Sequence, residues 1–339
     1  MVEDQIIKQI NQYGSDGIPF LFVIDFEKRM PWICPLNELD EKEVLFDVNG
    51  FSNYSDQDIT EKQLDFKVEP VSKTRYRKAI DLVQQHIKHG NSFLLNLTMP
   101  SRVETNYSLK EIFYQSKAKY KLWFRDQFVI FSPEIFIQTK GNIISSFPMK
   151  GTMDASLHNA KKQLIESKKE LAEHYTIVDL IRNDLSMVSK NVKVEEFRYI
   201  DHIKTHRKDL LQMSSKISGE LKEGWQKSMG ELIMTMLPAG SISGAPKKKT
   251  LEIIKEAEQY NRGYYTGIFG IFDGKNIDSG VMIRFIEKTD KGFIYKSGGG
   301  ITAKSNWEEE YQELIDKIYV PVRTSLPNGH LPKGENWGL

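Results

Sequence analysis

Two groups of strand-like runs, separated by a helix-rich segment, limit most strongly what this 339-residue chain can fold into. Runs rich in β-branched and aromatic residues occur before residue 50, over 92–147 and over 266–301. The stretch from His158 to Ser189 instead carries apolar residues at helical spacing. Three more segments have helical patterns: Lys208–Lys216, Trp225–Leu237 and Lys247–Tyr260. Because strands and helices do not alternate regularly, the sequence predicts an α+β fold and not repeated βαβ units.

Helices are also expected near both borders of this pattern. Tyr76, Ile80 and Val83 recur at near-helical spacing before Gly90, and a last helix is predicted over Trp307–Ile318. The chain contains no internal repeat, low-complexity tract or long linker. The predicted organisation is one continuous unit, with a short strand-rich part over residues 1–71, a main domain over 72–320 and a loosely ordered tail over 321–339.

Charge and cysteine content argue against several classes of protein. Lys and Arg (47) balance Asp and Glu (46), so the formal charge of +1 gives no field for nucleic acid or an anionic membrane. The N-terminal segment is acidic and no stretch reaches membrane-spanning length, so neither a signal peptide nor a membrane helix is expected. The single cysteine, Cys34, excludes an intramolecular disulfide and favours a reducing cytoplasm.

Two Glu-x-x-Glu pairs are candidates for binding a metal ion. Glu170 and Glu173 share one helix face, and Glu310 and Glu313 have the same spacing on another predicted helix. Each pair alone is more typical of a solvated helix surface. Two such helices facing each other would form an oxygen-only site for a hard cation such as Mg²⁺.

Three further segments offer groups for an anionic ligand. The run GSISGAPK leads into a helix, whose first amides bind anions well, but Gly244 is followed by Ala-Pro-Lys and not by the Lys-Ser/Thr of a phosphate-binding loop. Carboxylate binding is therefore the interpretation retained. Gly298, Gly299 and Gly300 allow close approach of a ligand or, more simply, a tight turn. Arg284, within the apolar run VMIRF, needs a partner such as an anionic substrate or an internal Asp or Glu.

A lysine before Gly-Thr is the candidate nucleophile. Lys150 follows a strand-like run, where a lysine is usually just solvated. Buried beside a cation, it would lose its proton and become nucleophilic. Glu134 lies sixteen residues earlier, where a hairpin partner strand would bring it near Lys150 and make an acid–base pair conceivable.

Eight motifs in this order resemble those of the chorismate-utilising enzymes: SPEIF, PMKGT, KELAEH with IVDLIRNDL, GSISGAPK, RGYYTGIFG, VMIRF, SGGGI and EEEYQE. This family includes anthranilate synthase component I, isochorismate and salicylate synthases, and aminodeoxychorismate synthase component I. The resemblance covers about residues 72–320, which makes this segment the chorismate-binding catalytic domain. It implies an α+β fold with two stacked, mainly antiparallel sheets flanked by helices.

The resemblance also implies roles for particular residues. Mg²⁺ would be held by Glu173 and Glu313, with Glu170 and Glu310 as neighbours that act partly through water. The implied substrate-binding residues are Thr152, Ser241, Gly244, Tyr265, Arg284, Gly298, Gly299 and Gly300.

Lys150 makes the chain similar to the aminodeoxychorismate synthases within this family, because anthranilate and isochorismate synthases typically carry alanine before Gly-Thr. The implied reaction is amination of chorismate to 4-amino-4-deoxychorismate, for p-aminobenzoate and folate. Lys150 would attack C2 while the C4 hydroxyl leaves with help from the acid Glu134. Ammonia, supplied by a glutamine amidotransferase partner, would then add at C4 and expel the lysine.

Two departures from the family pattern leave alternatives open. Gln212 stands where many relatives carry a histidine, and the part before Ser72 is shorter than in relatives that bind tryptophan, which argues against tryptophan inhibition. Anthranilate or isochorismate formation is an alternative activity, against which Lys150 argues. A non-catalytic subunit that binds chorismate or scaffolds an amidotransferase is another, against which the four carboxylates argue.

Overall fold

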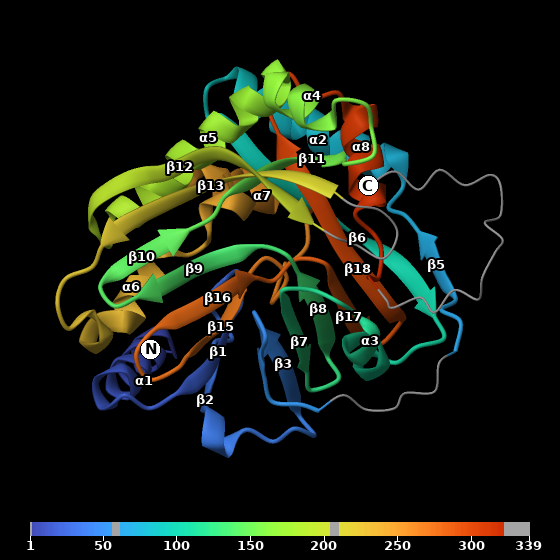
Figure 1. Ribbon diagram of the computed structural model, residues 1–339. Helices are drawn as coiled ribbons and strands as arrows, with labels where there is room; N and C mark the ends of the chain where they lie inside the picture. Colours follow the sequence, from blue (N-terminus) through green and yellow to red (C-terminus); the bar gives the residue numbers. More distant parts are fainter. Residues whose placement is uncertain (1, 56–61, 204–209, 322–339) are drawn as a thin grey trace. The chain divides into compact units, whose positions relative to one another are not determined.

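The protein, as a computed structural model, is described over residues 2–55, 62–203 and 210–321, and it divides into two compact units (Figure 1). Unit 1 consists of residues 1–39, 133–243 and 262–282, and unit 2 of residues 40–132, 244–261 and 283–339. Each unit contains one nine-stranded antiparallel sheet together with helices. The predicted α+β class with mainly antiparallel sheets is therefore confirmed. Apart from Pro321, the tail predicted over 321–339 lies outside the described residues.

The sheet of unit 1 has the strand order β11-β13-β10-β9-β16-β15-β1-β2, and β12 pairs with β13. Its strands are β1 (Phe20–Ile24), β2 (Trp32–Pro35), β9 (Ile135–Lys140), β10 (Ile143–Ser146), β11 (Met149–Asp154), β12 (Lys190–Ile203), β13 (Leu210–Glu220), β15 (Ile268–Phe272) and β16 (Ile277–Val281). Its helices are α1 (Val2–Asp16), η1 (Leu36–Glu38), α4 (Ala160–Glu166), α5 (Lys168–Ser186), η2 (Trp225–Ser228), α6 (Met229–Met236) and η3 (Gly240–Ile242).

The sheet of unit 2 has the order β14-β6-β18-β17-β8-β7-β3-β4, and β5 pairs with β6. Its strands are β3 (Val44–Val48), β4 (Phe51–Ser52), β5 (Phe66–Glu69), β6 (Leu94–Thr105), β7 (Tyr120–Phe124), β8 (Phe128–Ser132), β14 (Gly244–Ala245), β17 (Phe285–Thr289) and β18 (Gly292–Ile301). Its helices are α2 (Lys73–Lys88), α3 (Leu109–Gln115), α7 (Lys247–Glu258) and α8 (Trp307–Asp316).

Helix α5 packs on β11, β12 and β13 of unit 1 (Figure 1). It begins at Ser167, whose Oγ accepts a hydrogen bond from the Glu170 amide at 3.3 Å and so satisfies one free N–H of the first turn. Ile177, Ile181 and Leu185 recur at helical spacing and are buried. This apolar stripe fixes which residues of α5 face the sheet.

Helix α2 of unit 2 confirms the prediction made from its periodicity. Ser72 caps its N-terminus, and Tyr76, Ile80 and Val83 are buried among α7, α8 and β6. Helix α8 starts at Asn306, whose side chain accepts from the amides of Glu308 and Glu309. The acidic first turn of α8 also suits the positive end of the helix dipole.

The secondary structure differs from the prediction at β13 and at α1. The helix predicted over Lys208–Lys216 is strand β13 from Leu210 onwards, and residues 208 and 209 lie outside the described residues. Its short apolar run fits either structure by period alone, and pairing with β12 on one edge and β10 and β11 on the other makes it a strand. Helix α1 was not predicted, although Ile10 on it is fully buried.

None of the described helices is both long enough and apolar enough to span a membrane.

Candidate functional site

The strand that carries Lys150 contains one extra residue beside its partner. In the β11–β13 pair, Met149 lies opposite Ser214, whereas Thr152 lies opposite Gln212. Three steps along β11 therefore match two along β13, which is a β-bulge. Bulges break the regular alternation of a strand and re-aim the side chains beside them. The bulge here contains Lys150.

Gly151 lets this bulge approach helix α5. Its φ of +83° lies in the region that glycine adopts without strain, and a Cβ at this position would lie 2.9 Å from Glu170 Oε2. One turn further along α5, Glu173 Oε2 lies 3.7 Å from Lys150 Nζ. Both side chains of this ion pair are about a quarter exposed, at 27% and 28%. The structure thus brings the predicted nucleophile together with one predicted acid pair.

A buried histidine directly follows Glu173 on α5; it belongs to the motif KELAEH, but the sequence analysis gave it no role. His174 is fully buried, and its Nε2 lies 2.6 Å from the Oγ of Ser215 on β13. Its Nδ1 has no hydrogen-bond partner among the described residues. Burial, with the positive charges of Arg198 and Lys150 adding to it, lowers the pKa of His174 to about 4. His174 is therefore neutral at pH 7 and anchors α5 to β13 without adding charge.

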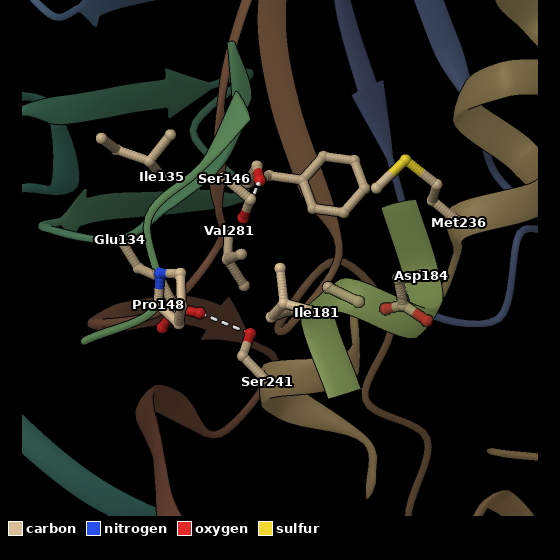
Figure 2. A pocket seen from close by; sticks show the side chains of 11 residues that line it. Glu134, Ile135, Ser146, Pro148, Ile181, Asp184, Met236, Ser241 and Val281 are labelled. Atoms are coloured by element: carbon tan, nitrogen blue, oxygen red, sulfur yellow. Dashed lines mark hydrogen bonds between the residues drawn. The ribbon is translucent and has the colours of Figure 1, made fainter. Parts of the chain in front are cut away.

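The predicted acid Glu134 is hydrogen-bonded to a predicted substrate-binding residue. Ser241, on η3, donates its hydroxyl hydrogen to Glu134 Oε1 at 2.5 Å (Figure 2). The two line one small cavity with a further set of unit 1 residues: Ile135, Phe136, Ser146, Pro148, Ile181, Asp184, Met236, Ala239 and Val281. Its volume of about 10 Å³ holds one water at most, so this cavity is too small for a substrate.

The second acid pair lies beside the triple glycine of unit 2. Glu310 is 7% exposed, and a Cβ on Gly299 would lie 3.5 Å from Glu310 Oε2 and 3.2 Å from Glu313 Oε1. Lys317 Nζ lies 2.5 Å from Glu313 Oε1 and donates to the Gly298 carbonyl at 2.9 Å. Gly299 therefore allows the carboxylates of α8 to approach the backbone of β18.

Tyr76 on α2 is a second residue that sequence reasoning treated only as core. It is fully buried, and its hydroxyl has no hydrogen-bond partner among the described residues. Burial, followed by the charges of Glu310 and Glu313, raises the pKa of this phenol. Tyr76 therefore keeps its proton in the neighbourhood of the acid pair.

The tight turn, one of the two interpretations of Gly298, Gly299 and Gly300, is wrong, whereas the strand-like run that contains them is confirmed. All three lie inside β18, where they pair with Thr98, Leu97 and Asn96 of β6. A Cβ on Gly298 would lie 2.2 Å from the Leu97 carbonyl oxygen. Close strand packing therefore requires glycine at residue 298, and this long-range contact cannot be read from local sequence.

Arg284 is not inside a strand as its apolar neighbours predicted. It lies between β16 and β17 with a φ of +55°, and its Nε donates to the Tyr319 hydroxyl at 3.2 Å. Its guanidinium also lies 5.3 Å from the centre of the Tyr319 ring. These contacts identify Tyr319 as a neighbour of Arg284. The sequence analysis had instead expected an anionic substrate or an internal Asp or Glu.

Two further predicted substrate-binding residues, Tyr265 and Gly244, are packed against backbone groups. Tyr265 is 4% exposed and lies in the turn before β15, where its amide donates to the Arg262 carbonyl at 3.2 Å. Gly244 pairs with Leu95 of β6 at a φ of +139°, and a Cβ there would lie 2.0 Å from the Leu94 carbonyl oxygen. Packing alone therefore requires glycine at residue 244.

The predicted site residues are divided between the two units. Unit 1 contains Glu134, Lys150, Thr152, Glu170, Glu173, Ser241 and Tyr265, and unit 2 contains Gly244, Arg284, Gly298, Gly299, Gly300, Glu310 and Glu313. Among the residues that the structure describes, no three His, Cys, Asp or Glu side chains gather so as to hold a metal ion. Gly151 of unit 1 nevertheless lies beside the Glu170 carboxylate, and Gly299 of unit 2 lies beside those of Glu310 and Glu313. Carboxylate oxygens are the donors that Mg²⁺ prefers.

Comparison with known proteins identifies the family. Residues 33–323 match the family described as chorismate binding enzyme. A Haemophilus influenzae protein named uncharacterized PabA-like protein is 51% identical over 318 residues, which cover 93% of this chain and 96% of that protein.

Two relatives of named activity are more distant. Aminodeoxychorismate synthase component 1 of Bacillus subtilis is 30% identical over 269 residues, covering 75% of this chain and 56% of that protein. Anthranilate synthase component 1 of Acetivibrio thermocellus is 33% identical over 277 residues, covering 77% and 55%. Identity therefore does not distinguish between these two activities.

Solved structures share the fold. The menaquinone-specific isochorismate synthase MenF of Escherichia coli matches with a TM-score of 0.68 at 15% identity, covering 93% of this chain and 80% of that one. Anthranilate synthase component I of Streptococcus pneumoniae matches with a TM-score of 0.64 at 25% identity, covering 76% and 59%. The chorismate-utilising fold is thereby shown.

The low pKa of His174 predicts a loss of stability in mild acid. The unfolded chain protonates this residue near pH 6.5, whereas the folded chain resists protonation until about pH 4. Unfolding is therefore favoured progressively as the pH falls from 6.5 to 4, by about 2 kcal/mol at pH 5, and not at all above this window. Thermal unfolding without added metal should show a smaller fall in Tm between pH 7 and 5 for His174→Gln than for the unchanged chain. Equal falls would contradict the buried neutral histidine.

Proposed function

This chain belongs to the chorismate binding enzymes, and on that premise we propose that it aminates chorismate at C4 to give 4-amino-4-deoxychorismate. The observation that carries the proposal is the primary amine of Lys150, held on a glycine bulge 3.7 Å from the Glu173 carboxylate. Related anthranilate and isochorismate synthases typically have alanine before this Gly-Thr. A lysine here adds a nucleophile that those reactions do not use.

The proposed chemistry has two displacements. Nζ of Lys150, as a neutral amine, bonds to C2 of chorismate, the ring double bonds shift, and the C4 hydroxyl leaves as water with a proton from Glu134. Ammonia then bonds to C4 and its extra proton returns to the Glu134 carboxylate, while the double bonds shift back and the C2–N bond breaks. Lys150 recovers its amine, and the net change replaces a hydroxyl by an amino group. The Ser241 hydrogen bond supports Glu134 in this role, because it fixes one carboxyl oxygen.

Mg²⁺ is the proposed cofactor, with Glu173 and Glu313 as ligands and Glu170 and Glu310 as their neighbours. When bound, it would neutralise and orient a substrate carboxylate. Three features of the chain support this: carboxylate-only donors, the glycines that give these groups room, and the short spacing on each helix. A Glu173 carboxylate engaged in this way no longer pairs with Lys150, whose amine is then available to substrate.

Ammonia is proposed to come from a glutamine amidotransferase partner. The names of two relatives support a partner: one is PabA-like, and the other is aminodeoxychorismate synthase component 1, a name that implies at least one further component. The relative named anthranilate synthase makes anthranilate the main rival product, and ring aromatisation in that reaction would release pyruvate. Lys150 weighs against this rival, because the rival needs no amine nucleophile.

Replacement of Lys150 tests the proposed chemistry. We expect Lys150→Ala to lower kcat for amination by at least about 10²-fold, the low end of what removing a reacting group costs. Lys150→Arg should lose as much, because arginine keeps the charge but does not become a neutral amine. Lys161→Ala, at an exposed position of helix α4, is the matched control and should remain active. Formation of the amino product at an undiminished rate by Lys150→Arg would rule out the covalent route.

Metal dependence tests the acid pairs. Glu173→Gln and Glu313→Gln should each raise the Mg²⁺ concentration that gives half-maximal activity by about 10–100-fold, because a neutral amide is a weaker ligand than a carboxylate. The control is Glu309→Gln, an exposed neighbour on α8, which should leave this concentration unchanged. The same shift in all three variants, or in none, would contradict the assignment of the ligands.

A further inference from the structure

A buried carboxylate on α5 contacts the loop that carries Ser241. Asp184 is 6% exposed, and its Oδ2 accepts a hydrogen bond from the Gly240 amide at 3.0 Å. Burying a carboxylate costs free energy unless hydrogen bonds compensate for the lost water. The hydrogen bond from the Gly240 amide therefore stabilises the buried Asp184 more than it would a surface aspartate. The proposed chemistry assigns Asp184 no part.

The loop is shaped to receive this carboxylate. A Cβ at Gly240 would lie 2.8 Å from Asp184 Oδ2, so only glycine lets the backbone come this close without a shift. The other end of η3 is also held, because the Ile242 carbonyl accepts from Arg262 Nη1 at 2.9 Å. Arg262 itself is buried. Ser241 therefore lies on a short segment that is fixed on both sides.

The hydrogen bond from Ser241 connects this fixed segment to Glu134. Asp184, Ser241 and Glu134 line the same small cavity, and Figure 2 shows Ser241 and Glu134 joined by their hydrogen bond. Because Glu134 Oε1 accepts the serine hydrogen, the acidic proton of a protonated Glu134 belongs on Oε2. The orientation of the acid then depends on where η3 is held.

We propose that Asp184 is a positioning residue, which through the Gly240 amide holds the Ser241 hydroxyl against Glu134 and thereby sets which carboxyl oxygen delivers the proton. The inference rests on the proposed function only in taking Glu134 as the acid. The link from Asp184 to the loop can be tested without turnover.

The first arm of the test measures amide hydrogen exchange at Gly240 by NMR. Asp184→Ala removes the acceptor and should speed exchange by at least about 10-fold, because a lost hydrogen bond exposes the amide to opening. Asp184→Asn is the matched control, because its side-chain oxygen still accepts, and it should restore most of the protection. Unchanged exchange in Asp184→Ala, or equal loss in Asp184→Asn, would overturn the proposal.

The second arm measures chorismate consumption by single and double variants. Asp184→Ala and Ser241→Ala should each lower kcat by about 10-fold with little change in KM, and the double variant should be no slower than Ser241→Ala alone, since both act on one chain of contacts. Multiplying losses would show that Asp184 acts independently of Ser241 and would overturn the proposal.

Two further provisions separate a failure to fold, and a failure of the proposed function, from a failure of the positioning role. If Asp184→Ala does not fold, Gly240→Ala replaces it in both arms, because its Cβ pushes against the intact carboxylate. Exchange and kcat should then change in the same directions. If the unchanged chain consumes no chorismate under any condition, the proposed function fails, while the exchange arm still decides whether Asp184 holds the loop.

Discussion

The contact between the bulge of β11 and helix α5 is the constraint on which the site of unit 1 depends. Gly151 leaves out the side chain that would collide with Glu170, so the strand can approach the helix. The same approach puts Lys150 beside Glu173, one turn further along α5. His174 then ties α5 to β13, and Asp184 ties its far end to η3. One helix thus contacts the proposed nucleophile and the loop beside the proposed acid, and it carries one predicted acid pair.

Features that depend on neighbours along the chain could be predicted from the sequence. The apolar periods of α2 and α5 give both helices, and Glu-x-x-Glu spacing gives the shared faces of the acid pairs, because these follow from helix geometry alone. Lys150 was singled out because it departs from the alanine typical of sister enzymes. Features set by distant partners were missed or wrong. Strand β13 forms through pairing with β10, β11 and β12, and residue 298 must be glycine because the backbone of β6 packs against it.

Buried polar side chains are also difficult to predict from the sequence. The pattern of a helix does not show whether a histidine, tyrosine or aspartate on it is exposed or buried. Burial gives His174 its low pKa and gives Asp184 its tight contact with Gly240. These residues support the groups predicted to react. Family membership does not reveal such support. Relatives with two different named activities are 30% and 33% identical to this chain, so identity does not separate even the activities.

The central claim is that Lys150 directs this chorismate binding enzyme to amination. It is tested most directly by identifying the product of the purified chain with chorismate and Mg²⁺ at mildly alkaline pH, with and without ammonium chloride. The account predicts 4-amino-4-deoxychorismate only when ammonium is present, and no pyruvate in either case. Anthranilate with pyruvate, or isochorismate formed without ammonium, would contradict it.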